Sequence, residues 1–146
     1  MALKTNRVVL VTGGSRGVGK GTALALGATG ATVYVSGRSS SDGQTTALPG
    51  NIHTTAEEIT ARGGKGIAVI CDHTDDQQIA ALIDQIIDEQ GRIDILVNNV
   101  YKVPDDMLEW QPFWKRPLDD HWQAMIDLGM RAHYVASYYA APHMIK

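Results

Sequence analysis

A glycine-rich segment between an apolar run and a helical pattern constrains this chain more than any other feature. Residues 7–12 read RVVLVT, a run too apolar for a strand with one exposed face, so it predicts a buried strand of a parallel sheet. Residues 12–19 follow as TGGSRGVG, and a helical pattern begins inside them. A strand, a glycine turn and a helix in this order indicate a site where backbone amides and a helix N-terminus hold a diphosphate.

The glycines of this segment have separate expected roles. Gly13 permits the tight turn, Gly17 lets the backbone approach the phosphates, and Gly19 lets the helix pack closely against the strand. We expect the amides between residues 13 and 19 to face the diphosphate. The expected cradle also includes the residues between these glycines, Ser15, Arg16 and Val18.

The rest of the chain alternates strand and helix patterns. Further strands are expected at 31–36, 66–71 and 93–97, and a long helix begins near residue 119. Thr74 and Gln77 have the spacing of a capping box, which would open the helix that ends at Gly91. The order β-α-β-α-β-α-β-α predicts an α/β fold with a doubly wound parallel sheet of Rossmann type.

Composition narrows the class of protein further. A chain of 146 residues fits one domain, 1–146, and the absence of a strand pattern after the long helix makes us expect only the first part of a longer domain. A net charge of −3 gives no cationic field for nucleic acid. No apolar run is long enough to span a membrane as a helix. The single cysteine, Cys71, is typical of a protein in a reducing compartment, so we expect a cytoplasmic protein. The five histidines show no metal-ligand spacing, so no metal is expected.

The end of the second strand indicates which dinucleotide fits. An NAD site places a carboxylate about 20 residues after the glycines to hold the ribose 2′-hydroxyl. Here Arg38 stands in that region, and its guanidinium suits the 2′-phosphate of NADP(H), with Arg16 as a second cation. We therefore expect NADP(H) to be preferred, with NAD(H) possible.

A P-loop phosphotransferase is the main alternative from the residues alone. Residues 14–20 read GSRGVGK, which matches the start of a P-loop. That loop needs Ser or Thr directly after the lysine to hold magnesium, and Gly21 stands there instead. A non-catalytic dinucleotide-binding module or pseudoenzyme is a second alternative.

Four features together resemble the short-chain dehydrogenase/reductase family. They are TGGSRGVG, Cys71-Asp72 after the third expected strand, Asn98-Asn99 after the fourth, and the helix that carries Trp122. Residues 48–59, 113–122 and 131–137 further resemble the branch around dehydrogenase/reductase SDR family member 1.

The resemblance implies an NADP(H)-dependent oxidoreductase that passes a hydride between the nicotinamide and a small carbonyl or alcohol substrate. It implies that Asp72 accepts a hydrogen bond from the adenine amino group and that His73 lies beside the adenine ring. Asn98 would contact the cofactor, Asn99 would tie the central strands together, and Val100 would line the nicotinamide side. It also implies homo-oligomers formed through the helix at 119–145.

Departures from the family pattern concern the catalytic residues. Gly129 occupies the position where many members carry a helix Asn, and Val100-Tyr101 replaces the usual Ala-Gly. The Tyr-x-x-x-Lys pair of the family is absent from these residues. We therefore expect the catalytic Ser, Tyr and Lys to lie beyond Lys146, and expect this chain to supply cofactor binding only and to be inactive alone.

Overall fold

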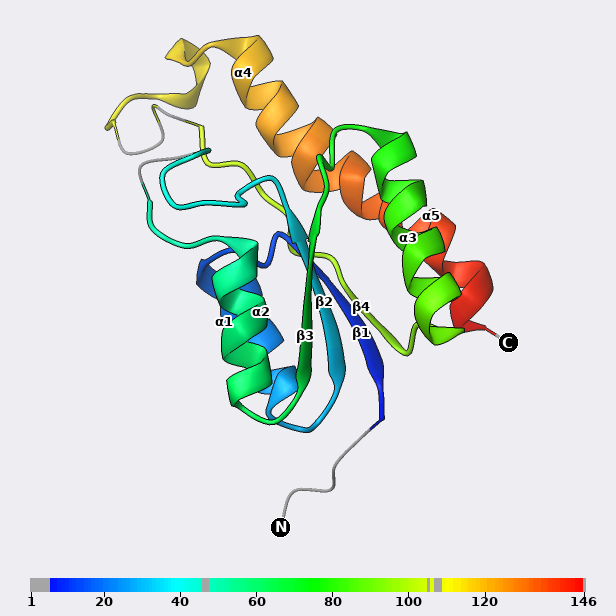
Figure 1. Ribbon diagram of the computed structural model, residues 1–146. Helices are drawn as coiled ribbons and strands as arrows, with labels where there is room; N and C mark the ends of the chain where they lie inside the picture. Colours follow the sequence, from blue (N-terminus) through cyan, green and yellow to red (C-terminus); the bar gives the residue numbers. More distant parts are fainter. Residues whose placement is uncertain (1–5, 46–47, 105, 107–108, 146) are drawn as a thin grey trace.

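The computed structural model describes residues 6–45, 48–104, 106 and 109–145 and shows a parallel sheet flanked by helices on both faces (Figure 1). The four strands lie in the order β3-β2-β1-β4, and all neighbouring pairs are parallel. Their bounds are β1 Val8–Thr12, β2 Thr32–Gly37, β3 Lys65–Ile70 and β4 Ile95–Val97. The helices after the first three strands are α1 Gly17–Gly27, α2 Ile52–Ala61 and α3 Asp76–Gln90. This arrangement confirms the predicted Rossmann-like α/β fold.

Strand residues alternate between two apolar layers. Val9, Val11 and Val33 pack with α1 and α2 on one face of the sheet. Leu10 and Tyr34 pack with α3 and the C-terminal helix on the other. Both faces of β1 are therefore covered, which explains why the strand is buried at every position and apolar from Val8 to Val11.

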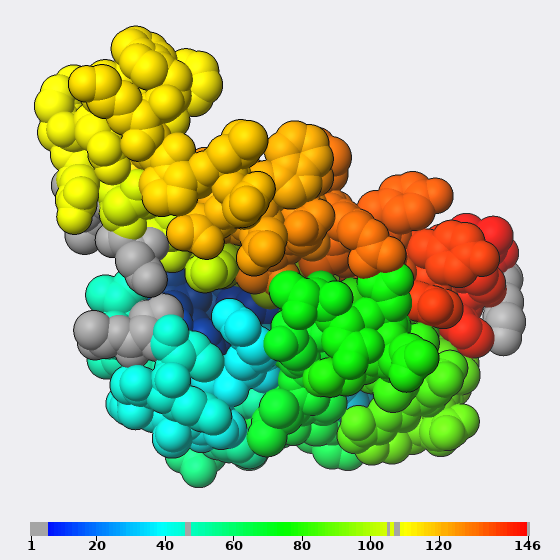
Figure 2. Space-filling model, turned by 90° about the horizontal axis from the view of Figure 1, so that it is seen from above, coloured from blue at the N-terminus to red at the C-terminus, as the bar shows by residue number. Residues whose placement is uncertain are grey.

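The carboxyl ends of all four strands meet at one edge of the sheet because the strands are parallel. Figure 2 looks onto this edge and shows a hollow between the cyan, green and yellow-orange segments, with the blue N-terminal segment on its floor. Ligands of open α/β sheets bind at this edge, outside the carboxyl ends of the strands.

The capping residue of α3 is Asp75, so the capping box predicted at Thr74 is wrong. The Asp75 side chain accepts hydrogen bonds from the backbone amides of Gln77 and Gln78. Thr74 instead donates its amide and its hydroxyl to the Asp72 carboxylate. Thr74 and Asp75 are both residue types that cap helices. Because Thr74 is bonded to Asp72, Asp75 is the residue that caps α3.

The helix predicted as one continuous element from residue 119 has three parts. α4 Leu118–Trp122 leads into a π-helical stretch, η2 Gln123–Arg131, and then into α5 Ala132–Met144 (Figure 1). A short 3-10 helix, η1 Phe113–Lys115, precedes them. A π-helix has a different side-chain period from an α-helix, so spacing on an α-helical wheel does not identify the buried face.

Four alanines, one valine and one leucine form the buried face of η2 and α5. These residues are Ala124, Leu128, Ala132, Val135, Ala136 and Ala140. Larger apolar side chains of the same segment are exposed, with Met130 at 62%, Tyr134 at 71% and Tyr138 at 65%. Within the described residues, no helix combines the length and the apolar character needed to span a membrane.

Replacing the capping residue should destabilise the fold measurably. Asp75→Ala leaves the first amides of α3 without their acceptor, so we expect the free energy of unfolding to fall by about 1 kcal/mol. Urea unfolding followed by circular dichroism measures this loss. Asp84→Ala, at an exposed position on the same helix, is the control and should change stability by less than about 0.5 kcal/mol.

Candidate functional site

The glycine turn after β1 is held by the end of β2. The amides of Gly13 and Gly14 both donate to the Ser36 carbonyl, at 2.8 and 3.1 Å. These two amides are therefore used inside the protein, and Gly13, at φ +71°, makes the turn that the sequence predicts. The amides that remain for a ligand are those of the first turn of α1, where helical N–H groups have no intrahelical acceptor.

The space around Gly17 is open. Gly17 begins α1 at φ +56°, and a Cβ built there meets nothing within 4 Å. An anion placed against this turn would face the amides of Gly17, Val18 and Gly19 and the positive end of the helix dipole. The Val18 side chain is 78% exposed, whereas Ser15 is buried under the turn. The arrangement suits a phosphate group that is bound by backbone amides rather than by side chains.

Asn99 fastens the end of β4 to the glycine turn. Its side-chain amide donates to the carbonyls of Thr12 and Gly13, both at 2.9 Å. Its backbone amide donates to the Thr12 hydroxyl at 3.0 Å. A Cβ at residue 19 would lie 2.2 Å from the Asn99 amide nitrogen and 2.4 Å from the Gly13 carbonyl oxygen, so only glycine fits at this position.

The neighbours of Asn99 fasten α5 to the same edge. The Asn98 amide donates to the Ser137 hydroxyl at 2.9 Å. Val100 is buried, and its carbonyl oxygen lies 2.9 Å from His133 Nε2. The bonds made by His133 and Ser137 were not predicted, because no local pattern links residues more than 30 positions apart.

Arg16 holds the loop between β2 and α2. Its guanidinium donates to the carbonyls of Gly50 and Pro49, at 2.7 and 3.2 Å, and to the Ser39 hydroxyl at 3.3 Å. The predicted second cation for a 2′-phosphate is thus engaged by the loop that follows Arg38.

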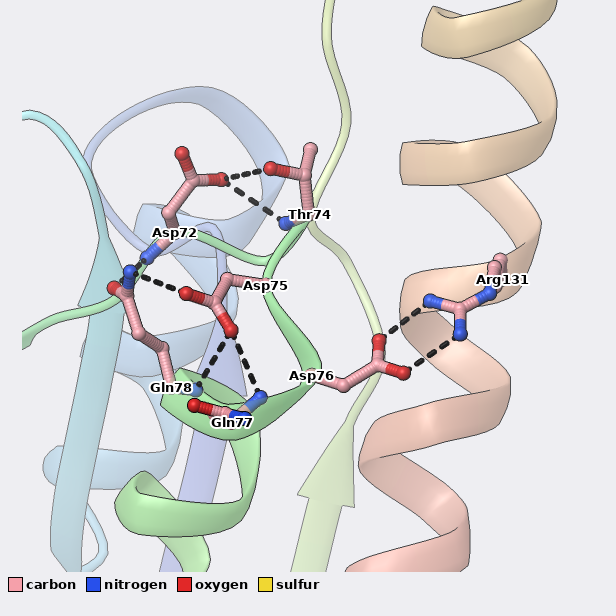
Figure 3. A network of polar contacts seen from close by, with 7 residues as sticks. All are labelled: Asp72, Thr74, Asp75, Asp76, Gln77, Gln78 and Arg131. Atoms are coloured by element: carbon pink, nitrogen blue, oxygen red, sulfur yellow. Dashed lines mark hydrogen bonds and ion pairs between the residues drawn. The ribbon is translucent and has the colours of Figure 1, made fainter.

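Arg38 and Asp72 meet at the ends of β2 and β3. Arg38 Nη1 lies 3.9 Å from Asp72 Oδ2, and both side chains are partly exposed. The other carboxylate oxygen of Asp72 accepts the amide and the hydroxyl of Thr74, at 3.0 and 2.8 Å (Figure 3). Burial raises the pKa of the Asp72 carboxyl, but the bonds from Thr74 and the nearby Arg38 charge outweigh it, so the net pKa is lowered.

His73 lies beneath this edge instead of on it. The side chain is 2% exposed, and its Nε2 is 2.9 Å from the Ser36 hydroxyl. Desolvation is the main cause that lowers the pKa of His73 to about 4. The Asp72 charge raises this pKa, whereas the His133 and Arg38 charges lower it. His73 is therefore neutral at physiological pH and supports Ser36, whose carbonyl holds the glycine turn.

A polar cavity lies between the start of α3 and η2. It has a volume of about 360 Å³ and is lined by Thr74, Gln123, Asp127 and Arg131. Arg131 pairs with both carboxylate oxygens of Asp76, at 2.5 and 2.6 Å, and so joins η2 to α3 (Figure 3). Figure 3 shows this pair on the far side of the α3 start from Asp72. It was not predicted, because each residue alone resembles a solvated surface charge.

Gly129, at the position where many family members carry a helix Asn, has a backbone oxygen close to where a side chain would begin. Gly129 lies in η2, and a Cβ there would be 3.3 Å from the Ala124 carbonyl oxygen. In the part of the chain that the structure describes, no three His, Cys, Asp or Glu side chains are placed to hold a metal ion.

Two glycine substitutions should separate close packing from helix propensity. Gly19→Ala places a methyl group against Asn99 and Gly13, so we expect a loss of about 1–3 kcal/mol in unfolding free energy. Gly21→Ala, two residues along the same helix, meets nothing within 4 Å and should stabilise by about 0.5–1 kcal/mol. Equal effects in urea unfolding would contradict the packing described for Asn99.

His73 should make stability depend on pH. Its pKa is about 4 in the folded state and near 6.5 when unfolded, so the unfolded state binds the extra proton between these values. The contribution is complete above pH 6.5 and is lost as pH falls toward 4, by roughly 3 kcal/mol in total. Urea unfolding at several pH values should show a shallower pH slope for His73→Gln than for the wild type, and equal slopes would contradict a neutral, buried His73.

Comparison with known proteins agrees with this arrangement of residues. The chain is 37% identical over 142 residues to dehydrogenase/reductase SDR family member 1 of Mus musculus, covering 95% of this chain and 42% of that protein. A putative dehydrogenase from Xanthomonas campestris superposes with a TM-score of 0.86 at 29% identity, covering 100% of this chain and 52% of that one. A metagenomic short-chain oxidoreductase in complex with NADP superposes with a TM-score of 0.79 at 30% identity, covering 99% and 59%.

The chain therefore spans about half the length of the relatives that it matches. The sequence profile of the short chain dehydrogenase family matches residues 7–146. With the glycine turn, the Asn99 tie and the parallel sheet in place, the chain belongs to the short chain dehydrogenase family.

Proposed function

We propose that this chain binds the cofactor of an NADP(H)-dependent oxidoreductase that exchanges hydride with a small carbonyl or alcohol substrate. The observation that carries the proposal is the open turn at Gly17, where α1 begins after β1 and a Cβ would meet nothing within 4 Å. A diphosphate needs this combination of free amides, helix dipole and absent side chains. The metagenomic relative in complex with NADP supports a nicotinamide dinucleotide as the ligand.

Each strand end contributes one expected role in binding. The turn after β1 would hold the diphosphate, and Arg38 after β2 would pair with the 2′-phosphate of NADP(H). Asp72 after β3 would accept from the adenine amino group, because its ionised carboxylate reaches the partly exposed edge. Asn98 after β4, which is exposed, would contact the cofactor toward the nicotinamide side.

The residues of this chain bind and orient, and the bound nicotinamide supplies the hydride chemistry. Asn99 and Ser36 hold the glycine turn in shape before the ligand arrives, so little ordering is needed on binding. The sequence holds no Tyr-x-x-x-Lys pair, so we assign no proton transfer to these residues. The large exposed side chains of η2 and α5 support self-association of the enzyme through this surface.

The position of Lys20 disfavours the phosphotransferase alternative. A P-loop lysine reaches back to the phosphates that the loop surrounds. Lys20 Nζ instead pairs with Glu58 of α2 at 2.7 Å. Dinucleotide binding uses neither a lysine nor a magnesium ligand at this point, so it fits the contacts better.

Replacing Arg38 should change cofactor preference. We expect Arg38→Asp to weaken NADPH binding at least about tenfold, while NADH binding changes little, because only NADPH carries the 2′-phosphate. Fluorescence titration of the full chain with each reduced dinucleotide measures the ratio of dissociation constants.

Arg62→Asp is the control, because Arg62 is an exposed arginine at the end of α2 and its replacement gives the same change in charge. An unchanged NADPH/NADH ratio in Arg38→Asp would remove the assignment of Arg38. Tighter binding of ATP–Mg²⁺ than of NADPH by the wild type would overturn the proposed function itself.

A further inference from the structure

We propose that Asp72 limits the preference for NADP(H) over NAD(H) by competing with the 2′-phosphate for the Arg38 guanidinium. The inference rests on the proposed function and adds a residue that sets its specificity. It gives Asp72 a role opposite in sign to that of Arg38, besides any contact with adenine.

Asp72 is fixed in a position to compete. One carboxylate oxygen is held by the amide and the hydroxyl of Thr74, so the side chain cannot rotate away without losing both bonds (Figure 3). The second oxygen is left to face Arg38 Nη1 at 3.9 Å. The backbone amide of Asp72 is held as well, by the Gln78 side chain at 2.9 Å.

The other cations near the glycine turn already have partners. Arg16 donates to two carbonyls and a hydroxyl of the loop at 39–50. Lys20 pairs with Glu58 on α2. A 2′-phosphate would therefore depend chiefly on Arg38, the guanidinium that Asp72 shares.

The effect of Asp72 on the 2′-phosphate can be distinguished from its contact with adenine by comparing the two cofactors. A 2′-phosphate carries up to two negative charges, so a carboxylate beside the same guanidinium repels it and competes for the same donors. NAD(H) has a hydroxyl at that position and is indifferent to the charge. Both cofactors share the adenine, so any lost contact with the base cancels in their affinity ratio.

The test is the NADPH/NADH affinity ratio of Asp72→Asn. The amide oxygen of Asn can still accept from Thr74, so the turn is kept while the charge is removed. We expect the ratio to shift toward NADPH by about threefold to tenfold at low ionic strength, and by less at high salt. The adenine nucleotides 2′,5′-ADP and 5′-AMP, which differ only by the 2′-phosphate, give a second ratio that should shift the same way.

Asp84→Asn is the matched control, because it makes the same charge change at an exposed site on α3. Asp72→Ser is a second variant in case Asn disturbs the turn, since its hydroxyl also accepts from Thr74. A ratio that equals that of the control, or that shifts toward NADH, would overturn the inference and leave the proposed function standing. Binding of neither dinucleotide by the wild type would instead refute the proposed function.

Discussion

The candidate site depends on the hydrogen bonds that the Asn99 side-chain amide donates. This amide joins the end of β4 to the end of β1 by donating to the Thr12 and Gly13 carbonyls. The contact is possible only because residue 19 has no Cβ, so the start of α1 can lie against the amide. The start of α1 therefore lies close to both Asn99 and the end of β1.

The cationic side chains at the carboxyl edge of the sheet already interact with other groups of the protein. Arg16 holds the loop after β2, Lys20 pairs with α2, and Arg38 faces Asp72. Such surface pairs contribute little to stability. In the proposed function, their larger effect is on which dinucleotide the edge accepts. His73 forms no ion pair at this edge, because burial keeps its side chain neutral, next to Ser36.

The C-terminal helical segment serves two surfaces at once. Alanine side chains let α5 approach α3 and β4, and the Arg131–Asp76 pair joins the end of η2 to the start of α3. The larger residues Met130, Tyr134 and Tyr138 face outward. Met130 lies in the π-helical stretch, and Tyr134 and Tyr138 lie in α5.

The order of strands and helices, the parallel sheet and the glycine turn could all be predicted from the amino-acid sequence. These follow from local patterns: apolar runs of β-branched residues, helical periods, and a glycine where φ must be positive. Which side chains are free to meet a ligand depends instead on contacts that form when the chain folds. The sequence suggested Arg38 as the main cation, Arg16 as a second one and, by resemblance, His73 beside the adenine. In the structure the Arg16 side chain is engaged by Gly50, Arg38 faces Asp72, and His73 is buried. Those outcomes depend on contacts between residues 34–37 positions apart, and no local pattern encodes them.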